Sequence, residues 1–578
     1  MMKRIAFAIA LALAAATVSV SVDAQRGTAI SPKLIGFDVV EATIDQMQTA
    51  MQRGQVTSKE LVLQSFARIA FYKDLLNPVI ALNRDAIAEA EQRDIERQQG
   101  RIRGPLHGIP IALKDNILTT NMPTSGGALA FKGLMPPYEA TLVTNLRNAG
   151  AVIIAKTILT ELANWVTNGM PGNYSAVGGY GMNPYDPRKD PRPGLDAFNL
   201  PFADGRPAMS VAGSSSGIGT AASLWAANVG TETSGSILSP SNQNMLAGIK
   251  PTVGRISRWG VIPIVADQDT AGPLARNVTD AAIMLGAMEG VDSHDPATTT
   301  CSPPPGRDYT RFLRLAGLRG ARIGIPRANY YDPITPPGRT APVGGLTAAQ
   351  SAMMAEVIGV LQREGAVIVD PANIPSVVDT EPSNNLLLFG TCTGTRAADT
   401  LGSCSVVLKY GFKRDFNLFL QTLGASAPVP TLTALRQVNL ANTGQGTIKY
   451  RQDLLDVSDE MDLTADALRY QLDRAKDLHL TTAHGIDEVM NANKLDALLF
   501  PGSSSANIAA RATYPTVIVP YGFIPNAPTP AFPAGFNARD QPFGVSFTGS
   551  LCSEPRLIEL AYAFEQATKK RVPSIFTP

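Results

Sequence analysis

The sequence predicts an α/β fold in which a large mixed β-sheet lies between layers of helices. Short apolar runs that are typical of strands buried on both faces lie at residues 109–113, 151–155, 497–500 and 516–520. Amphipathic patterns with a helical period, at residues 86–99 and 141–149, separate such runs, which favours a sheet covered by helices on each side. No clear linker divides the chain, so we expect a single domain.

Within this domain we expect a helical N-terminal cover over residues 25–100 and the main α/β body over residues 101–578. Thr57 and Glu60 have the spacing of a capping box, which predicts that a helix begins at residue 58. Residues 186–207 are rich in Pro, Asp and Arg, and the stretch near residues 300–345 contains a Pro/Gly-rich segment. We interpret both as insertions.

The N-terminal sequence is typical of an export signal. Lys3 and Arg4 precede an uncharged, mostly small and apolar stretch over residues 5–22, and Val22 and Ala24 provide the small side chains that a signal peptidase reads. We expect residues 1–24 to be a signal peptide and the protein to be exported, periplasmic or secreted; an uncleaved anchor is the alternative. No other segment approaches the roughly 18 to 20 continuous apolar residues of a membrane span, so we expect no stable span after cleavage.

Composition and charge argue against disordered and nucleic-acid-binding classes. Hydrophobic residues make up 44 % of the chain and charged residues 17 %, a balance typical of a globular protein with a large core. The 50 basic and 49 acidic residues give a formal net charge of +1 without a long basic run, so we expect no nucleic-acid partner.

An exported protein can form disulfides between its four cysteines. Cys392 and Cys404 are close in sequence, and we favour a bridge between them; Cys301 and Cys552 are distant, and free thiols are the alternative. The spacing of the cysteines matches no zinc pattern, and we expect neither a metal nor a cofactor.

Residues 213–217, Gly-Ser-Ser-Ser-Gly, match the G-x-S-x-G nucleophile elbow with Ser215 at its centre. An elbow needs a histidine later in the chain, and the candidates are His294, His479 and His484. A flexible turn is the alternative interpretation of this motif.

A second glycine-shaped loop contains Thr233, Ser234, Gly235 and Ser236, whose backbone N–H groups are suited to stabilising an oxyanion. A serine nucleophile needs a base, and a lysine serves if burial keeps it neutral. The candidate lysines are Lys114, which follows an apolar run, and its rivals Lys156 and Lys250.

These motifs occur in a chain that resembles the amidase signature family. The likeness is carried, in order, by residues 57–83, GPLHGIPIALKDN at 104–116, AGAVIIAKTILTELAN at 149–164, the block 212–280, and residues 514–520, 542–545 and 559–568. The resemblance implies the amidase signature fold for the catalytic domain. It also implies a Ser-cisSer-Lys triad, in which Lys114 is the base, Ser214 the middle serine in a cis peptide, and Ser236 the nucleophile.

In the implied mechanism Ser236 attacks an amide carbonyl to form an acyl-enzyme, and the N–H groups of Thr233, Ser234 and Gly235 hold the oxyanion. The chain departs from the family pattern in three ways. Ser234 stands where a glycine is frequent, and Leu238 stands where an arginine is frequent. The interval between the two loops is slightly shorter than usual, which leaves Ser215 as an alternative to Ser214.

The implied reaction is hydrolysis of a carboxylic amide C–N bond in a small-molecule or peptide amide, without a metal or cofactor. The block GTETSGSI, together with KPTVGRISRWGVIPI and QDTAGP, is most similar to bacterial peptide amidases, which remove a C-terminal amide. Hydrolysis of aryl-acylamides, or of other xenobiotic or fatty amides, is the alternative within the family. A further alternative is an α/β-hydrolase esterase that uses Ser215.

Overall fold

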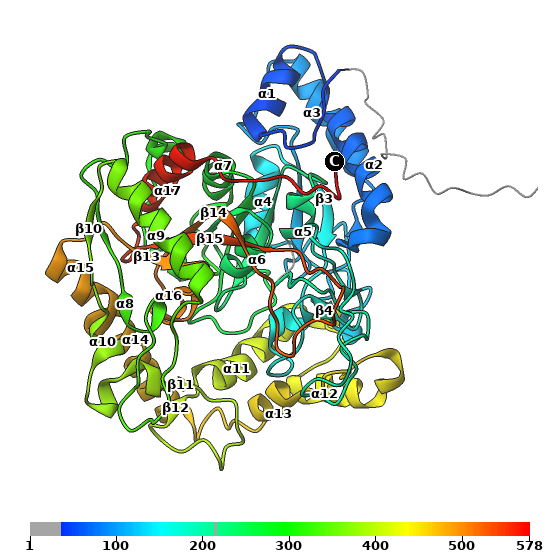
Figure 1. Cartoon of the computed structure of the whole chain (residues 1–578). Coiled ribbons are helices and arrows are strands. Elements are labelled where there is room, and N and C mark those ends of the chain that lie inside the picture. The colour runs from blue at the N-terminus through cyan, green and yellow to red at the C-terminus, as the bar shows by residue number, and fades with distance from the viewer. Residues whose placement is uncertain (1–35, 213–216) are drawn as a thin grey trace, which may run out of the picture. The chain divides into compact units, whose positions relative to one another are not determined.

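The computed structural model describes residues 36–212 and 217–578 of the chain. An 11-stranded mixed sheet runs through this part of the protein, and helices pack on both of its faces (Figure 1). Residues 36–578 form one compact unit, which confirms the predicted α/β fold in a single domain. The predicted signal peptide at residues 1–24 lies outside the described residues.

The strands of the large sheet follow the spatial order β1-β3-β2-β6-β8-β7-β14-β15-β13-β9-β10. Their bounds, in chain order, are β1 Val79–Leu82, β2 Pro110–Lys114, β3 Val152–Thr157, β6 Ala227–Glu232, β7 Ala247–Lys250, β8 Thr270–Ala275, β9 Arg322–Gly324, β10 Val367–Val369, β13 Ala497–Pro501, β14 Thr516–Ile524 and β15 Gln541–Thr548. Parallel pairs join β3 to β2, β2 to β6, β13 to β9 and β9 to β10, and antiparallel pairs join the remaining neighbours. Small two-stranded ladders are formed by β4 Tyr174–Ser175 with β5 Gly179–Tyr180 and by β11 Gly390–Thr391 with β12 Cys404–Ser405.

The helices between these strands are mostly short to medium in length. Their bounds are α1 Ile44–Gln52, α2 Ser58–Leu76, α3 Ala86–Gln98, α4 Thr141–Asn148, α5 Gly217–Ala221, α6 Leu238–Gln243, α7 Val278–Met288, α8 Arg327–Tyr330, α9 Ala348–Arg363, α10 Pro375–Val378, α11 Val407–Thr422, α12 Leu432–Ala441, α13 Asp453–Asp459, α14 Ala467–Thr481, α15 Asp487–Asn493, α16 Ala506–Arg511 and α17 Glu554–Thr568. None of the helices in residues 36–212 and 217–578 has the length and apolar character needed to cross a membrane.

Alternation along the strands distributes apolar side chains to both faces of the sheet. In β2, Ile111 and Leu113 pack in one core with helices α1, α4, α7, α9 and α17, whereas Ala112 packs in another core with α2, α3 and α5. Successive residues of a strand point to opposite faces, so a strand that is apolar throughout requires helices on both sides.

A third core lies in the helical region formed by α11, α12 and α13, which lie together in Figure 1. Phe412 and Phe416 of α11 are fully buried there and stack with ring centroids 5.2 Å apart. Ile262 and Ile264, from the loop between β7 and β8, belong to the same core. This helical region is therefore anchored on a loop that leads back to the sheet.

The expected N-terminal cover is largely helical, and the capping box of Thr57 and Glu60 at α2 is present as predicted. Residues 79–82 differ, because they form the edge strand β1, which pairs with β3. Within the stretch 300–345, Arg322–Gly324 likewise forms β9 of the large sheet, so this part belongs to the core rather than to a surface insertion.

Two disulfides link the four cysteines. Cys392 pairs with Cys404, as predicted, across a sequence separation of 12 residues. Cys301 pairs with Cys552, whose separation of 251 residues gave no basis for expecting the bridge.

Candidate active site

Lys114 is the last residue of β2 and is completely buried. Because β2 and β6 are parallel neighbours, with Leu113 opposite Val229, the end of β2 lies beside the end of β6. The Lys114 Nζ donates to Thr231 Oγ1 at 2.7 Å and to the Thr231 carbonyl oxygen at 3.3 Å. The sheet thus joins the predicted base to the strand that leads into the predicted nucleophile loop.

Burial lowers the pKa of Lys114 to about 7, although the negative charges of Asp269 and Glu232 oppose this shift. Within residues 36–212 and 217–578, no carboxylate lies at ion-pair distance from the Lys114 ammonium. A buried lysine without a direct counter-ion is favoured in its neutral form, which is the form that accepts a proton.

The loop that carries Ser236 connects β6 to α6 and wraps around the Glu232 side chain. The Glu232 carboxylate accepts hydrogen bonds from the backbone N–H groups of Ile237 at 2.6 Å and Leu238 at 2.9 Å. Burial raises the pKa of Glu232, while Lys250 and these N–H groups, together with that of Gly235, oppose the shift. Ser236 lies one residue before this anchored turn and is half-buried.

Gly235 allows the loop to turn immediately before Ser236. Its φ is +100°, a conformation that residues with a side chain rarely adopt. Ser234, on the other side of Gly235, is exposed.

Asp269 holds the start of the same loop. Thr233 Oγ1 donates to Asp269 Oδ1 at 2.5 Å, and Gln268 Nε2 donates to the Thr233 carbonyl oxygen at 3.2 Å. The other oxygen of Asp269 accepts the N–H groups of Ile264 at 2.8 Å and Val265 at 3.0 Å. Burial raises the pKa of Asp269 to about 7.

The rival lysines have different surroundings. Lys156 forms a buried ion pair with Asp115 at 3.1 Å and also donates to Thr124 Oγ1 at 2.6 Å. Lys250 donates to the Tyr514 carbonyl oxygen at 2.7 Å, and burial lowers its pKa to about 8. Lys156 is therefore held by a charge partner, whereas Lys114 and Lys250 contact neutral oxygens.

The serine loop at residues 213–216 lies outside the described residues, so Ser214, the alternative Ser215 and the expected cis peptide carry no structural description. On either side of this loop, Val211 and Gly217 both lie next to Asn244, which follows the end of α6. Asn244 Nδ2 donates to the Val211 carbonyl oxygen at 3.4 Å, and a Cβ on Gly217 would lie only 3.0 Å from the same Nδ2. The residues that flank the loop are thus held against the turn that follows α6.

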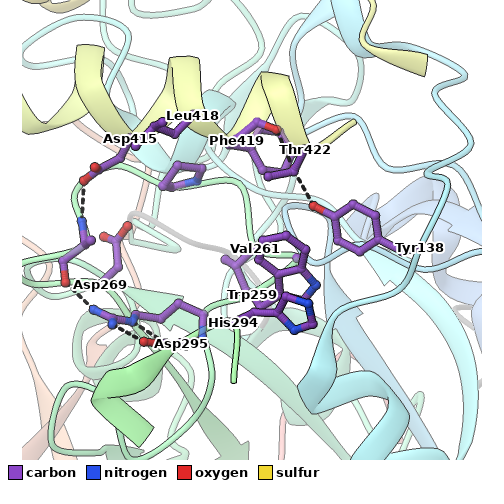
Figure 2. A pocket seen from close by; sticks show the side chains of 14 residues that line it. Tyr138, Trp259, Val261, Asp269, His294, Asp295, Asp415, Leu418, Phe419 and Thr422 are labelled. Atoms are coloured by element: carbon purple, nitrogen blue, oxygen red, sulfur yellow. Dashed lines mark hydrogen bonds and ion pairs between the residues drawn. The ribbon is translucent and has the colours of Figure 1, made fainter. Parts of the chain in front are cut away.

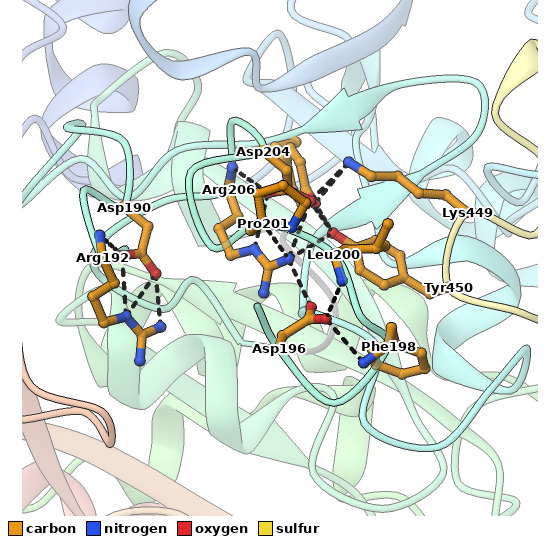
Figure 3. A network of polar contacts seen from close by, with 11 residues as sticks. Asp190, Arg192, Asp196, Phe198, Leu200, Pro201, Asp204, Arg206, Lys449 and Tyr450 are labelled. Atoms are coloured by element: carbon orange, nitrogen blue, oxygen red, sulfur yellow. Dashed lines mark hydrogen bonds and ion pairs between the residues drawn. The ribbon is translucent and has the colours of Figure 1, made fainter. Parts of the chain in front are cut away.

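The predicted insertion at residues 186–207 contains no helix and no strand of the large sheet, and charged contacts fix it (Figure 3). Arg206 pairs with Asp196 at 2.8 Å and with Asp204 at 2.9 Å, and Lys449 pairs with Asp204 at 2.8 Å. The Arg206 pairs hold the segment together, and the Lys449 pair ties it to the chain between α12 and α13.

The three histidines of the nucleophile-elbow alternative have their own partners. His294 is exposed and stacks on Trp259, with ring centroids 4.4 Å apart. His484 contacts Asp379 at 2.8 Å and Glu488 at 2.9 Å, and its ring stacks with that of His479. His479 and His484 lie at the junction of α14 and α15.

A cavity of about 250 Å³ opens beside the Asp269 carboxylate (Figure 2). In Figure 2 the carboxylates of Asp269, Asp295 and Asp415 lie on one side and aromatic rings on the other. The lining residues are Tyr138, Arg258, Trp259, Gly260, Val261, Pro263, Ala266, Asp269, His294, Asp295, Asp415, Leu418, Phe419 and Thr422.

The sequence motifs did not identify the roles of Thr231, Glu232 and Asp269. Glu232 is the last residue of β6, directly before the loop of Thr233 to Ser236, so its place beside that motif was an available signal. Asp269 lies 36 residues after Thr233, its hydrogen-bond partner, and no spacing rule connects the two.

Comparison with known proteins gives a consistent match. The family model Amidase matches residues 60–194 and 201–558. A probable amidase of Arabidopsis thaliana is 34 % identical over 547 residues, which cover 93 % of this chain and 92 % of that protein. The structure of a peptide amidase from Stenotrophomonas maltophilia is similar with a TM-score of 0.76 and 36 % identity, covering 93 % of this chain and 99 % of the other. The structure of a 6-aminohexanoate cyclic dimer hydrolase shares the fold, with a TM-score of 0.66, 18 % identity and coverage of 94 % and 100 %.

Proposed function

This chain belongs to the Amidase family and is an amide hydrolase, and we propose that it removes the amide group from the C-terminus of peptides through a triad of Lys114, Ser214 and Ser236. The observation that supports the triad most strongly is the state of Lys114. It is a fully buried lysine with a pKa of about 7, at the end of a strand whose parallel neighbour leads directly into the Ser236 loop.

In the proposed reaction, neutral Lys114 accepts the proton of Ser214, and Ser214 accepts the proton of Ser236. The Ser236 Oγ attacks the amide carbonyl carbon, and the N–H groups of Thr233, Ser234 and Gly235 stabilise the oxyanion. Collapse of this intermediate breaks the C–N bond, and the nitrogen leaves as ammonia with a proton relayed through Ser214. Water then attacks the acyl-enzyme ester and releases the carboxylic acid.

The contacts around the Ser236 loop support preorganisation of this site. Glu232 accepts N–H groups from the residues after Ser236, and Asp269 accepts the Thr233 hydroxyl. A loop fixed at both ends needs little reorganisation during the reaction, which favours stabilisation of an oxyanion by its backbone N–H groups.

A peptide substrate is supported by the likeness to the Stenotrophomonas maltophilia peptide amidase at 36 % identity over nearly the whole of both chains. Export of the protein also belongs to this proposal. Cys301–Cys552 and Cys392–Cys404 are both bridged, and disulfides persist mainly in oxidising compartments, in agreement with the signal-like N-terminal sequence.

Covalent labelling with a fluorophosphonate, followed by peptide mass mapping, tests the triad. We expect label on Ser236 that is lost in Lys114→Ala and in Ser236→Ala. It should be retained in the matched control Ser239→Ala, a half-buried serine three residues further along the chain in α6. Label on Ser215 would refute the assignment and favour a nucleophile elbow.

Ammonia release from a panel of peptide amides, anilides and fatty amides tests the substrate class. We expect the peptide amides to be cleaved with the highest kcat/KM. Preferred cleavage of anilides or fatty amides would overturn the peptide proposal.

A further inference from the structure

We propose that the cavity between Trp259 and Phe419 receives the side chain of the substrate's C-terminal residue and selects for a bulky, uncharged, preferably aromatic side chain. This inference rests on the proposed function, because it names the specificity of the same site. It is carried by the rings that line the cavity, by the pairing of the charges around it, and by its connection to the segments of Lys114 and Ser236.

The aromatic wall of the cavity is rigid. The Trp259 ring lies between Tyr138, with centroids 5.0 Å apart and planes inclined by 20°, and His294, with centroids 4.4 Å apart and planes inclined by 17°. The Tyr138 hydroxyl is hydrogen-bonded to Thr422 Oγ1 at 2.5 Å, which joins this wall to the end of α11. Rings that are already fixed lose little conformational entropy when another ring packs against them.

The charged groups around the cavity are already paired with protein partners. Arg258 Nε donates to Asp295 at 2.7 Å, and Arg414 Nε donates to Asp415 at 2.6 Å. Asp269 accepts three hydrogen bonds, from Thr233, Ile264 and Val265.

The charged lining residues therefore all have protein partners: Arg258, Asp295 and Asp415 are in ion pairs, and Asp269, which has no counter-ion among the described residues, is held by three neutral hydrogen-bond donors while burial raises its pKa to about 7. Burying a charged substrate side chain without a counter-charge is costly, whereas an apolar one gains from leaving water. This difference favours an uncharged side chain in the cavity.

The cavity is connected to the segments that carry two of the three proposed triad residues, Lys114 and Ser236. Val261, which lines it, forms a bridge with Ile117, and the neighbouring Ile262 N–H donates to the Asn116 carbonyl oxygen at 2.8 Å. Asp269, which also lines it, accepts the hydroxyl of Thr233 in the loop of Ser236. The cavity is thus built on the chain segments that follow Lys114 and precede Ser236.

The size of the cavity and the chemistry of the leaving group determine which part of the substrate it receives. Its volume of about 250 Å³ is below the roughly 300–1,000 Å³ typical of sites that enclose a whole drug-sized ligand, so it suits a single side chain. In the proposed reaction the leaving group is ammonia, which needs no such space. The side chain therefore belongs to the acyl part of the substrate, which is the C-terminal residue of the peptide.

The test compares N-acetyl amino-acid amides of phenylalanine, alanine, arginine and aspartate by the kcat/KM of ammonia release. The variants are Trp259→Ala and the milder Phe419→Leu, with Leu440→Ala, an exposed leucine of α12, as the matched control. Folding of each variant is checked by its thermal transition and by fluorophosphonate labelling of Ser236. We expect the wild-type protein to prefer the phenylalanine amide over the alanine amide by about tenfold or more.

Both cavity variants should reduce this preference, and Trp259→Ala should lower kcat/KM more for the phenylalanine amide than for the alanine amide. The control should keep the wild-type preference. A wild-type preference for alanine, arginine or aspartate, or an equal loss on the phenylalanine and alanine amides in Trp259→Ala, would overturn the inference while leaving the triad intact. If Ser236 is labelled but no peptide amide is cleaved, the proposed peptide specificity fails, and this inference fails with it.

Discussion

Replacing Lys114 with methionine should abolish turnover and leave the fold intact, whereas the same replacement of Lys156 should destabilise the fold. Both side chains are completely buried, but only Lys156 has a carboxylate partner, Asp115 at 3.1 Å, among the residues that the structure describes. Lys156→Met leaves the Asp115 charge buried without its cation, which typically costs about 3–5 kcal/mol. Lys114→Met removes hydrogen bonds to Thr231, with an expected cost of roughly 1–2 kcal/mol.

Wild type and Lys114→Met should also differ in how stability depends on pH. A fall in the pKa of Lys114 from 10.5 to about 7 means that the unfolded chain binds a proton between these pH values that the folded protein does not. The wild-type free energy of unfolding therefore gains about 1.4 kcal/mol per pH unit from this group as the pH rises through that window, and loses it as the pH falls. Lys114→Met lacks this contribution. When the pH is lowered from 9.5 to 7.5, wild type therefore loses free energy of unfolding that the variant keeps, and the stability difference shifts in favour of the variant.

Urea unfolding at pH 7.5 and 9.5, with ammonia release from a peptide amide at pH 8, measures both effects. Turnover by Lys114→Met would refute the role of Lys114 as the base. A stability difference between Lys114→Met and wild type that does not change with pH would refute the neutral state of the buried lysine.

The pH profile, the glycine before Ser236 and the two stacked histidines provide further tests. Because the reaction needs neutral Lys114, kcat/KM should fall about tenfold per pH unit below pH 7 and level off above it; a flat profile from pH 5 to 8 would contradict this. Gly235→Ala forces a side chain into a φ of +100°, so we expect a loss of about 1–2 kcal/mol of stability and slower fluorophosphonate labelling of Ser236, and labelling at the wild-type rate would argue against this strain. His479→Ala and His484→Ala should retain turnover, and loss of turnover in either variant would favour the nucleophile elbow.

The fold could be predicted largely from local patterns. Strands that are apolar on both faces, such as the predicted run at residues 109–113, require two covering layers, and the structure places helices on both faces of the corresponding strand β2. The capping box of Thr57 and Glu60 marked the start of α2 for an equally local reason. The other seven strands of the large sheet were not predicted; β1 and β9, for example, are short and pair with strands that are distant in sequence.

For the proposed site, local sequence supplied the candidate groups, which are a lysine after an apolar run and serines in two glycine-containing motifs. Separating Lys156 from Lys114 required the folded chain, because a pKa depends on partners that come from elsewhere in the sequence. Lys156 meets Asp115, whereas Lys114 meets Thr231 across the parallel pair of β2 and β6. The cavity beside Asp269 has the same origin: Tyr138, Trp259 and Phe419 come from three distant segments, and folding alone brings their side chains together.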